Sequence, residues 1–210
     1  MDAYALLFAS TLSAGTVLAL AALGLLINEK AGVINLGAEG MMLCAALAGF
    51  AAVVHTGSTL VGFLAGMGAG ALLAAIFGVL VIWLNTNQSA TGLALSLFGG
   101  GFSAFAGLNY VQAKMPETPK FAIPYLADLP VVGPALFRHH PLVYGAIVIA
   151  ALLVYFLYRT RAGLVLRSVG ESPESAHALG YNVRMIRLGA VMAGGALCGL
   201  AGAYVSTVYT

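Results

Sequence analysis

The sequence predicts an all-α, polytopic membrane protein, on the basis of its composition, its apolar runs and the two long intervals that separate the last of them. Of the 210 residues, 61% are hydrophobic and only 8% are charged, whereas soluble domains hold roughly 25% charged residues. The apolar residues gather in six runs, each close to the ~20 residues that a helix needs to cross a bilayer. A proline-rich interval at 111–140 and a long polar interval at 159–187 separate the last of these runs. We therefore expect residues 1–210 to form one transmembrane domain of six helices.

The predicted spans follow the apolar runs in order. The first run follows Asp2 without a basic flank and is too long for the core of a signal peptide, so we interpret it as a retained span. Glycines recur at four-residue spacing in the third and last spans, which predicts close helix packing. These glycines are Gly62, Gly66, Gly70, Gly195 and Gly199. The six spans cover residues 4–27, 36–54, 59–84, 90–110, 141–158 and 188–208.

The fourth span contains three consecutive glycines, Gly99 to Gly101. Because glycine loosens a helix, this run favours a break that lines a cavity.

The basic residues predict how the chain is oriented. Five of the nine Lys and Arg residues lie within 159–187, so the positive-inside rule places this interval in the cytoplasm. Alternation of the spans then places residues 28–35 and the neighbourhood of Ser89 in the cytoplasm as well. The proline-rich interval 111–140 falls on the extracytoplasmic side, where its prolines exclude a transmembrane helix. It is either a connecting loop or a docking surface for a partner.

A short helix is predicted inside the interval 159–187. The hydroxyl of Ser172 can cap its first turn, Pro173 suits the first helical position, and Glu174 favours the positive end of the helix dipole. Gly180 then supplies a left-handed stop, which gives a helix from Pro173 to Leu179. A helix of this length is unstable alone in water and needs a packing partner. The alternative is a solvated connecting loop.

Uncommon polar residues at the span boundaries are candidates for the substrate path. Asn35 can cap the helix of the second span, and Glu39 follows one turn later, either at the interface as a favourable charge for the helix N-terminus or in contact with a solute. Asn87 and Gln88 precede the fourth span. Amide side chains suit a neutral, hydrogen-bonding solute better than a charged one. We therefore expect these four residues to lie near a translocation path.

Several functions are excluded by what the sequence lacks. Cys44 and Cys198 are isolated in apolar runs, and His139 and His140 have no neighbouring ligands, so no disulfide, metal site or cofactor is expected. The net charge is only +2, which gives no basic face for nucleic acid. No catalytic cluster is present. No Gly-Lys dipeptide occurs, so any ATP hydrolysis requires a separate subunit.

Three stretches resemble the permeases of ATP-binding-cassette (ABC) importers. Residues 174–180 read ESAHALG and resemble the Glu-Ala-Ala-x-x-x-Gly signature of these permeases, with Ser175 in place of the first Ala. Residues 29–42 read EKAGVINLGAEGMM and resemble the Glu-Lys-x-Gly-Val-x-Asn-[Leu/Ile]-Gly-x-Glu-Gly-x-Met pattern of the branched-chain amino acid, sugar and nucleoside type. Residues 87–95 read NQSATGLAL and are similar to the Asn-Gln-x-x-x-Gly-Leu-Ala-Leu stretch of nucleoside permeases.

The resemblance implies a permease subunit in the bacterial cytoplasmic (inner) membrane that takes up a nucleoside, with a sugar or a branched-chain amino acid as alternatives. It also implies that the short helix is a coupling helix for an ABC ATPase subunit. The other implied partners are a second permease subunit, an extracytoplasmic solute-binding protein and the lipid bilayer. Members of this family continue well past the coupling loop, so we expect a C-terminally incomplete permease. The coupling residues are Ser172, Pro173, Glu174, Ala176 and Gly180.

Two other functions remain open at this point. Glu39 and the expected break at Gly99 to Gly101 are also typical of an ion-driven secondary transporter, which uses midplane carboxylates and broken helices. Uptake that survives an uncoupler but stops on ATP depletion would exclude that class. A non-transporting membrane scaffold is the other alternative.

Overall fold

The fold is a bundle of long helices, seen in a computed structural model that describes residues 2–113, 121–122 and 138–209. Within these ranges, six helices are long and apolar enough to cross a membrane, which confirms the predicted all-α polytopic class. Two short strands pair antiparallel, with Phe121 opposite His139. The elements in order are α1 (Asp2–Lys30), α2 (Ala38–Thr56), α3 (Thr59–Ile82), α4 (Gln88–Gly107), η1 (Leu108–Tyr110), β1 (Phe121–Ala122), β2 (Arg138–His139), α6 (Pro141–Arg159), α7 (Arg161–Glu171), α8 (Pro173–Ala178), α9 (Val183–Tyr204) and η2 (Val205–Tyr209).

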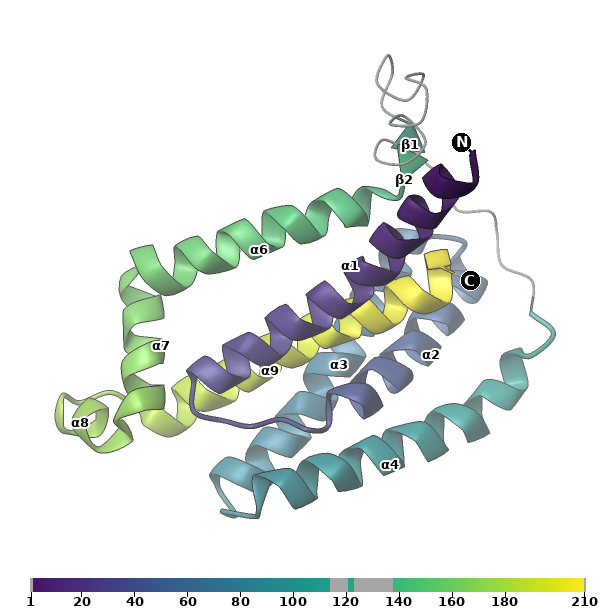
Figure 1. The fold of residues 1–210 in the computed structure, drawn as a ribbon. Coiled ribbons are helices and arrows are strands. Elements are labelled where there is room, and N and C mark those ends of the chain that lie inside the picture. Colours follow the sequence, from purple (N-terminus) through teal and green to yellow (C-terminus); the bar gives the residue numbers. More distant parts are fainter. Residues whose placement is uncertain (1, 114–120, 123–137, 210) are drawn as a thin grey trace.

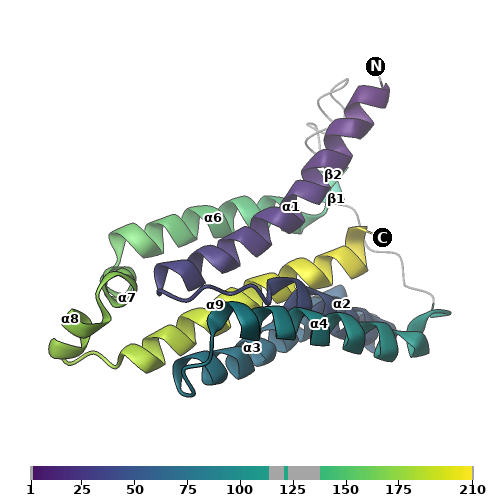
Figure 2. The ribbon, with the colours of Figure 1, turned by 60° about the horizontal axis from the view of Figure 1, so that its bottom comes forward.

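The helices alternate in direction, so the connections gather at the two ends of the bundle (Figure 1). One end, called here the α8 end, holds the α1–α2 loop (31–37), the α3–α4 turn (83–87), α7 and α8. The opposite end holds the α2–α3 turn and the start of α6. Figure 2 shows α9 between α1 and α6 on one side and α2, α3 and α4 on the other. The three stretches that resemble permease motifs therefore all begin or lie at the α8 end of the bundle.

The centre of the bundle is built from glycines that let helix backbones touch. A Cβ at Gly66 would lie 3.0 Å from the carbonyl oxygen of Gly199, and a Cβ at Gly195 would lie 2.7 Å from that of Gly70. A side chain at these positions would force α3 and α9 apart. In a membrane, where lipid is as apolar as the helix surfaces, such close packing is a main source of helix association. The predicted close approach of these two spans is confirmed.

The expected break at Gly99 to Gly101 is wrong, because α4 runs without interruption from Gln88 to Gly107. Gly99 is buried where α4 meets α2, and a Cβ there would lie 2.5 Å from the carbonyl oxygen of Gly40. The glycine thus serves close packing. An apolar environment without water also favours a continuous helix, since each broken backbone hydrogen bond leaves polar groups without a partner.

Candidate functional site

The short helix predicted within 159–187 is α8. Pro173 occupies its first turn, and Gly180 adopts a left-handed φ of +87° just beyond its end, as predicted. The helix ends at Ala178, one residue earlier than expected. The predicted cap is wrong: the hydroxyl of Ser172 donates to Ser175 Oγ at 2.7 Å and makes no cap bond to the backbone. The hydroxyl of Ser172 is thus directed at another side chain and not at the backbone N–H groups of the first turn.

One side of α8 packs on the rest of the protein and the other is exposed. Ala176 is buried at 1% exposure and its carbonyl oxygen accepts from the backbone N–H of Tyr181 at 3.2 Å. Glu174 and His177 are exposed, and Leu179 is 76% exposed although it is apolar. Because α8 lies outside the apolar spans, this leucine does not have lipid as its natural environment. α8 and the residue directly after it therefore leave an acidic group and an apolar group exposed.

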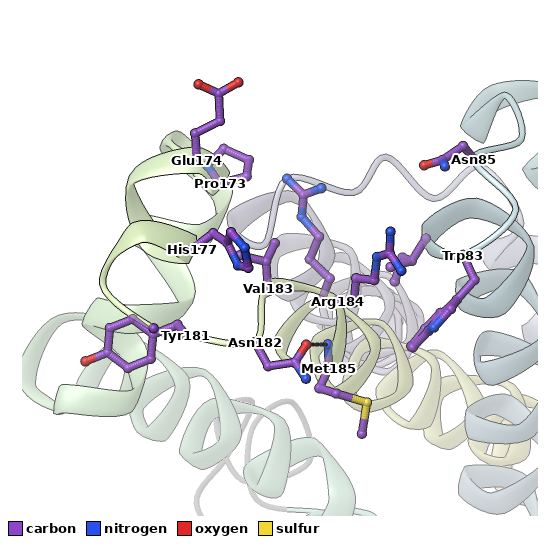
Figure 3. A pocket seen from close by; sticks show the side chains of 13 residues that line it. Trp83, Asn85, Pro173, Glu174, His177, Tyr181, Asn182, Val183, Arg184 and Met185 are labelled. Atoms are coloured by element: carbon purple, nitrogen blue, oxygen red, sulfur yellow. Dashed lines mark hydrogen bonds between the residues drawn. The ribbon is translucent and has the colours of Figure 1, made fainter.

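A cavity of about 870 Å³ lies between α8 and the α3–α4 turn. Trp83 and Asn85 line it from one side, and His177, Tyr181 and Arg184 line it from the other (Figure 3). Glu174 stands at its edge and points away from the other labelled side chains (Figure 3). The mixture of aromatic, amide and cationic groups can receive a polar protein segment. α8 thus forms one wall of a cleft whose other wall belongs to α3 and the turn that follows it.

An additional helix, α7, precedes α8 and was missed by the sequence analysis. Thr160 caps it by accepting from the backbone N–H of Gly163 at 3.0 Å. Its buried residues are Gly163, Leu166 and Val169, which recur every three residues and form one apolar face. Arg161 and Arg167 made the segment resemble a polar loop. The signal that could have found it is a threonine followed by apolar residues at helical spacing.

α7 reaches the α1–α2 loop through a contact between two glycines. Gly32 has a left-handed φ of +77°, and a Cβ there would lie 3.1 Å from the carbonyl oxygen of Gly170. A Cβ at Gly170 would in turn lie 3.1 Å from the backbone nitrogen of Gly32 and would overlap the carbonyl oxygen of Lys30. Arg187, in the first turns of α9, donates to the loop and to α7 at the same place. α7 and the α1–α2 loop, which holds the predicted path residue Asn35, therefore touch directly.

Asn35 is buried and organises the α1–α2 loop. Its Oδ1 accepts from the backbone N–H of Gly37 at 2.9 Å, and its Nδ2 donates to Met41 Sδ at 3.6 Å. The helix cap of α2 is Gly37, without a side-chain cap bond. The expectation that Asn35 caps this helix is therefore wrong, because its oxygen is used one step earlier to close the turn that precedes the helix.

The other three predicted path residues lie at the same end of the bundle but differ in their contacts. Gln88 Oε1 accepts from the backbone N–H of Ile34 at 2.7 Å and so joins α4 to the α1–α2 loop. Asn87 caps α4 by accepting from the backbone N–H of Ala90 at 3.1 Å. Glu39 is exposed in the first turn of α2, where a negative charge favours the helix dipole. The structure thus brings Asn35 and Gln88 to one loop and gives Asn87 a capping bond.

At the opposite end, His140 caps α6. Its Nδ1 accepts from the backbone N–H of Leu142 at 3.2 Å. The imidazole ring packs against Phe63 of α3 and Tyr204 of α9, with ring centroids 5.6 and 5.9 Å away. Burial among these rings lowers the pKa of His140, since the charged form is disfavoured away from water. This histidine thus fixes the start of α6 against the central helices.

Comparison with known proteins identifies the family. The family model described as branched-chain amino acid transport system / permease component matches residues 7–210. The chain is 42% identical to a provisionally named glucose ABC transporter permease of Haloferax volcanii over 96% of this chain and 62% of that protein. It is 34% identical to a guanosine ABC transporter permease of Bacillus subtilis, over 95% of this chain and 66% of the relative. A nucleoside ABC transporter permease of Lactococcus lactis is 32% identical to this chain, over 94% of this chain and 66% of that relative.

The chain spans 62–66% of the length of these relatives. No solved structure shows a significant match. The family match covers nearly the whole chain and agrees with the six candidate spans and with the three motifs of the sequence. This chain is therefore a multi-pass protein of the cytoplasmic membrane and belongs to the family of branched-chain amino acid transport system permease components.

Proposed function

We propose that the chain acts as a transmembrane permease subunit of an ABC importer and that α8 is the helix that docks on its ATPase. The observation that carries this proposal is the state of α8, which is held through the buried Ala176 and leaves Glu174, and Leu179 directly after the helix, exposed. A helix of six residues is too short to persist alone. Its exposed side next to a cleft supports a role as a contact for a second protein.

In this proposal the α8 end faces the cytoplasm and the opposite end faces outward. The arginines of the segment 159–187 support this orientation through the positive-inside rule. The expected extracytoplasmic interval 111–140 falls mostly outside the described residues, which include only its edges and Phe121–Ala122. A solute-binding protein would meet the outward end. A second permease subunit would complete the path.

The solute in this proposal is a neutral, hydroxyl-rich compound, and a nucleoside is the first candidate. The relatives are named for guanosine, for nucleosides and for glucose, and all of these solutes carry a sugar ring. Amide groups such as those of Asn35 and Gln88 exchange hydrogen bonds with such solutes without attracting ions. Uptake of labelled guanosine in competition with unlabelled glucose separates the two classes.

The proposed mechanism is alternating access, driven by ATPase subunits that are separate from this chain. ATP binding closes the ATPases, and α8 moves as a rigid lever with them. An ion-driven transporter is less well supported than the sequence suggested, because the expected break in α4 is absent. Uptake that continues with an uncoupler and stops on ATP depletion is the expected result.

The docking role is tested with Gly180→Val, which disturbs the end of α8. Valine in a left-handed conformation is strained by roughly 1–2 kcal/mol, and space around Gly180 is otherwise open. The matched control is Gly57→Val, because Gly57 has a similar φ of +70° and open surroundings at the opposite end. We expect Gly180→Val to lose the ATPase on purification from native membranes while Gly57→Val keeps it. Retention by both variants at equal protein level would contradict the proposal.

A further inference from the structure

Arg187 connects the coupling segment to the candidate path loop. Its Nε donates to the carbonyl oxygen of Ala31 at 3.1 Å, and its Nη2 donates to the carbonyl oxygen of Val169 at 3.4 Å. Ala31 follows α1 directly, and Val169 lies in the last turn of α7. We propose that Arg187 is a positioning residue that transmits the movement of α7 and α8 to the α1–α2 loop. The proposal rests on the proposed coupling role of α8.

The two carbonyl groups lack the partners that a continuing helix would supply. The N–H group that would bond to Val169 O belongs to the residue four positions later, which is Pro173 and has no N–H. The residue four positions after Ala31 is Asn35, which lies beyond the end of α1. The C-terminal ends of α1 and α7, where helix dipoles are negative, thus meet at one guanidinium. A planar group with several fixed donors suits such a pair of acceptors.

The contact between α7 and the α1–α2 loop transmits movement of α7 toward the loop as well as movement away from it. Gly32 and Gly170 meet backbone to backbone, because neither position has room for a Cβ. Movement of the end of α7 toward α1 must therefore displace the loop, since packed backbones leave no space to absorb it. Movement away is resisted by the two hydrogen bonds of Arg187. The contact formed by Gly32, Gly170 and Arg187 therefore moves the loop with α7 in both directions.

The loop is bonded in turn to α4. The backbone N–H of Ile34 donates to Gln88 Oε1 at 2.7 Å, and Ser96 Oγ donates to the carbonyl oxygen of Leu36 at 3.0 Å. A Cβ at Gly92 would lie 2.9 Å from the backbone nitrogen of Leu36, so the loop lies directly on α4. A shift of the loop therefore reaches the start of α4 and the side chain of Gln88. These contacts form one continuous physical connection from α7 to the candidate path.

A buried polar group nearby favours a second arrangement of these helices. Asn28, in the last turn of α1, is fully buried, and neither its Nδ2 nor its Oδ1 has a hydrogen-bond partner among the described residues. Its side chain packs on Gly194 of α9. A polar group without a partner disfavours the arrangement that buries it. Separation of α1 from α9 at the α8 end would expose the amide of Asn28 to possible partners. Arg187 of α9 bonds to Ala31, directly after α1, at this same end.

The proposal is tested with Arg187→Gln in the assembled transporter in native membranes or proteoliposomes. Three quantities are measured: the amount of ATPase that co-purifies, the rate of ATP hydrolysis, and the solute taken up per ATP hydrolysed. We expect assembly and hydrolysis within about twofold of wild type and uptake per ATP reduced about tenfold, which is within the usual range of coupling between sites. The control is Arg159→Gln, because Arg159 is also an exposed arginine at the α8 end, lies in the last turn of α6 and does not line the cleft. It should keep the wild-type ratio.

Arg187→Lys provides a second variant that keeps the charge. A lysine can donate to one of the two carbonyl groups but lacks the planar fork that reaches both, so its uptake per ATP should fall between those of wild type and Arg187→Gln. A wild-type ratio in Arg187→Lys or Arg187→Gln, or an equal loss in Arg159→Gln, would overturn the proposal. Failure of the proposed function looks different, because the wild-type protein itself would then not co-purify with an ATPase.

Discussion

The contact between Gly32 and Gly170 makes a quantitative prediction about Gly32→Ala. Alanine at a left-handed φ is strained by roughly 1–2 kcal/mol through its own backbone. At Gly32 the new Cβ would also lie 3.0 Å from Arg187 Nη2, 3.1 Å from Gly170 O and 3.2 Å from Gly170 Cα. The arginine can move, but the backbone of Gly170 moves only with α7. Such overpacking adds about 1–3 kcal/mol, for a total of about 2–5 kcal/mol.

Gly57→Ala is the control that separates these two contributions. Gly57 has a φ of +70°, close to the +77° of Gly32, but a Cβ at Gly57 would have no neighbouring atom within 4 Å. Alanine at Gly57 should therefore show the backbone contribution alone, about 1–2 kcal/mol.

The assay is thermal unfolding of the purified protein in detergent, followed by the loss of helical circular dichroism. We expect the midpoint of Gly32→Ala to fall about 1.5 to 4 times as far as that of Gly57→Ala, because overpacking adds about 1–3 kcal/mol to a backbone strain of about 1–2 kcal/mol that both variants share. Equal shifts for the two variants would mean that α7 does not pack on the α1–α2 loop, and the reasoning about this junction would then be refuted.

Three further predictions concern buried polar groups and orientation. Asn28→Leu keeps the branched shape but removes an amide without a partner, so the thermal midpoint should rise by the equivalent of ~1 kcal/mol; an unchanged or lower midpoint would contradict this. Burial lowers the pKa of His140 below its ordinary 6.5, so the unfolded chain binds more protons and stability should fall as pH drops below 6.5. His140→Asn can keep the cap without titrating, and a pH slope that survives in this variant would count against the assignment. In a background without native cysteines, Ser58→Cys should react with a membrane-impermeant thiol reagent in intact cells and Tyr181→Cys only after permeabilisation; the reverse pattern would invert the proposed topology.

The sequence predicted the spans and the helix stops because these depend on local composition. Apolar runs of spanning length gave six helices, and the left-handed turn at Gly180 follows from the absence of a Cβ. The glycine spacing in the third and last spans predicted a close contact between helices, although it could not name the partner of each glycine. These features need only neighbouring residues, which the sequence provides.

The remaining features depend on contacts between distant segments. α7 was missed because Arg161 and Arg167 interrupt its apolar residues, and because α1, on which its apolar face packs together with α6, is distant in the sequence. The break at Gly99 was wrongly expected because the local sequence does not show that Gly99 packs against Gly40. The bond from Arg187 to Ala31 joins residues separated by 156 positions. No local pattern predicts such a pair.

The central claim is that α8 docks on an ATPase, and Glu174→Arg tests it most directly. Glu174 is exposed and at the edge of the cleft, so arginine should leave the membrane spans intact while it places a positive charge at the positive end of α8. The measurement is the amount of ATPase recovered with the tagged permease from native membranes, normalised to the permease itself. The account predicts a normal level of Glu174→Arg in the membrane with the ATPase lost. Recovery of the ATPase at the wild-type ratio would contradict it.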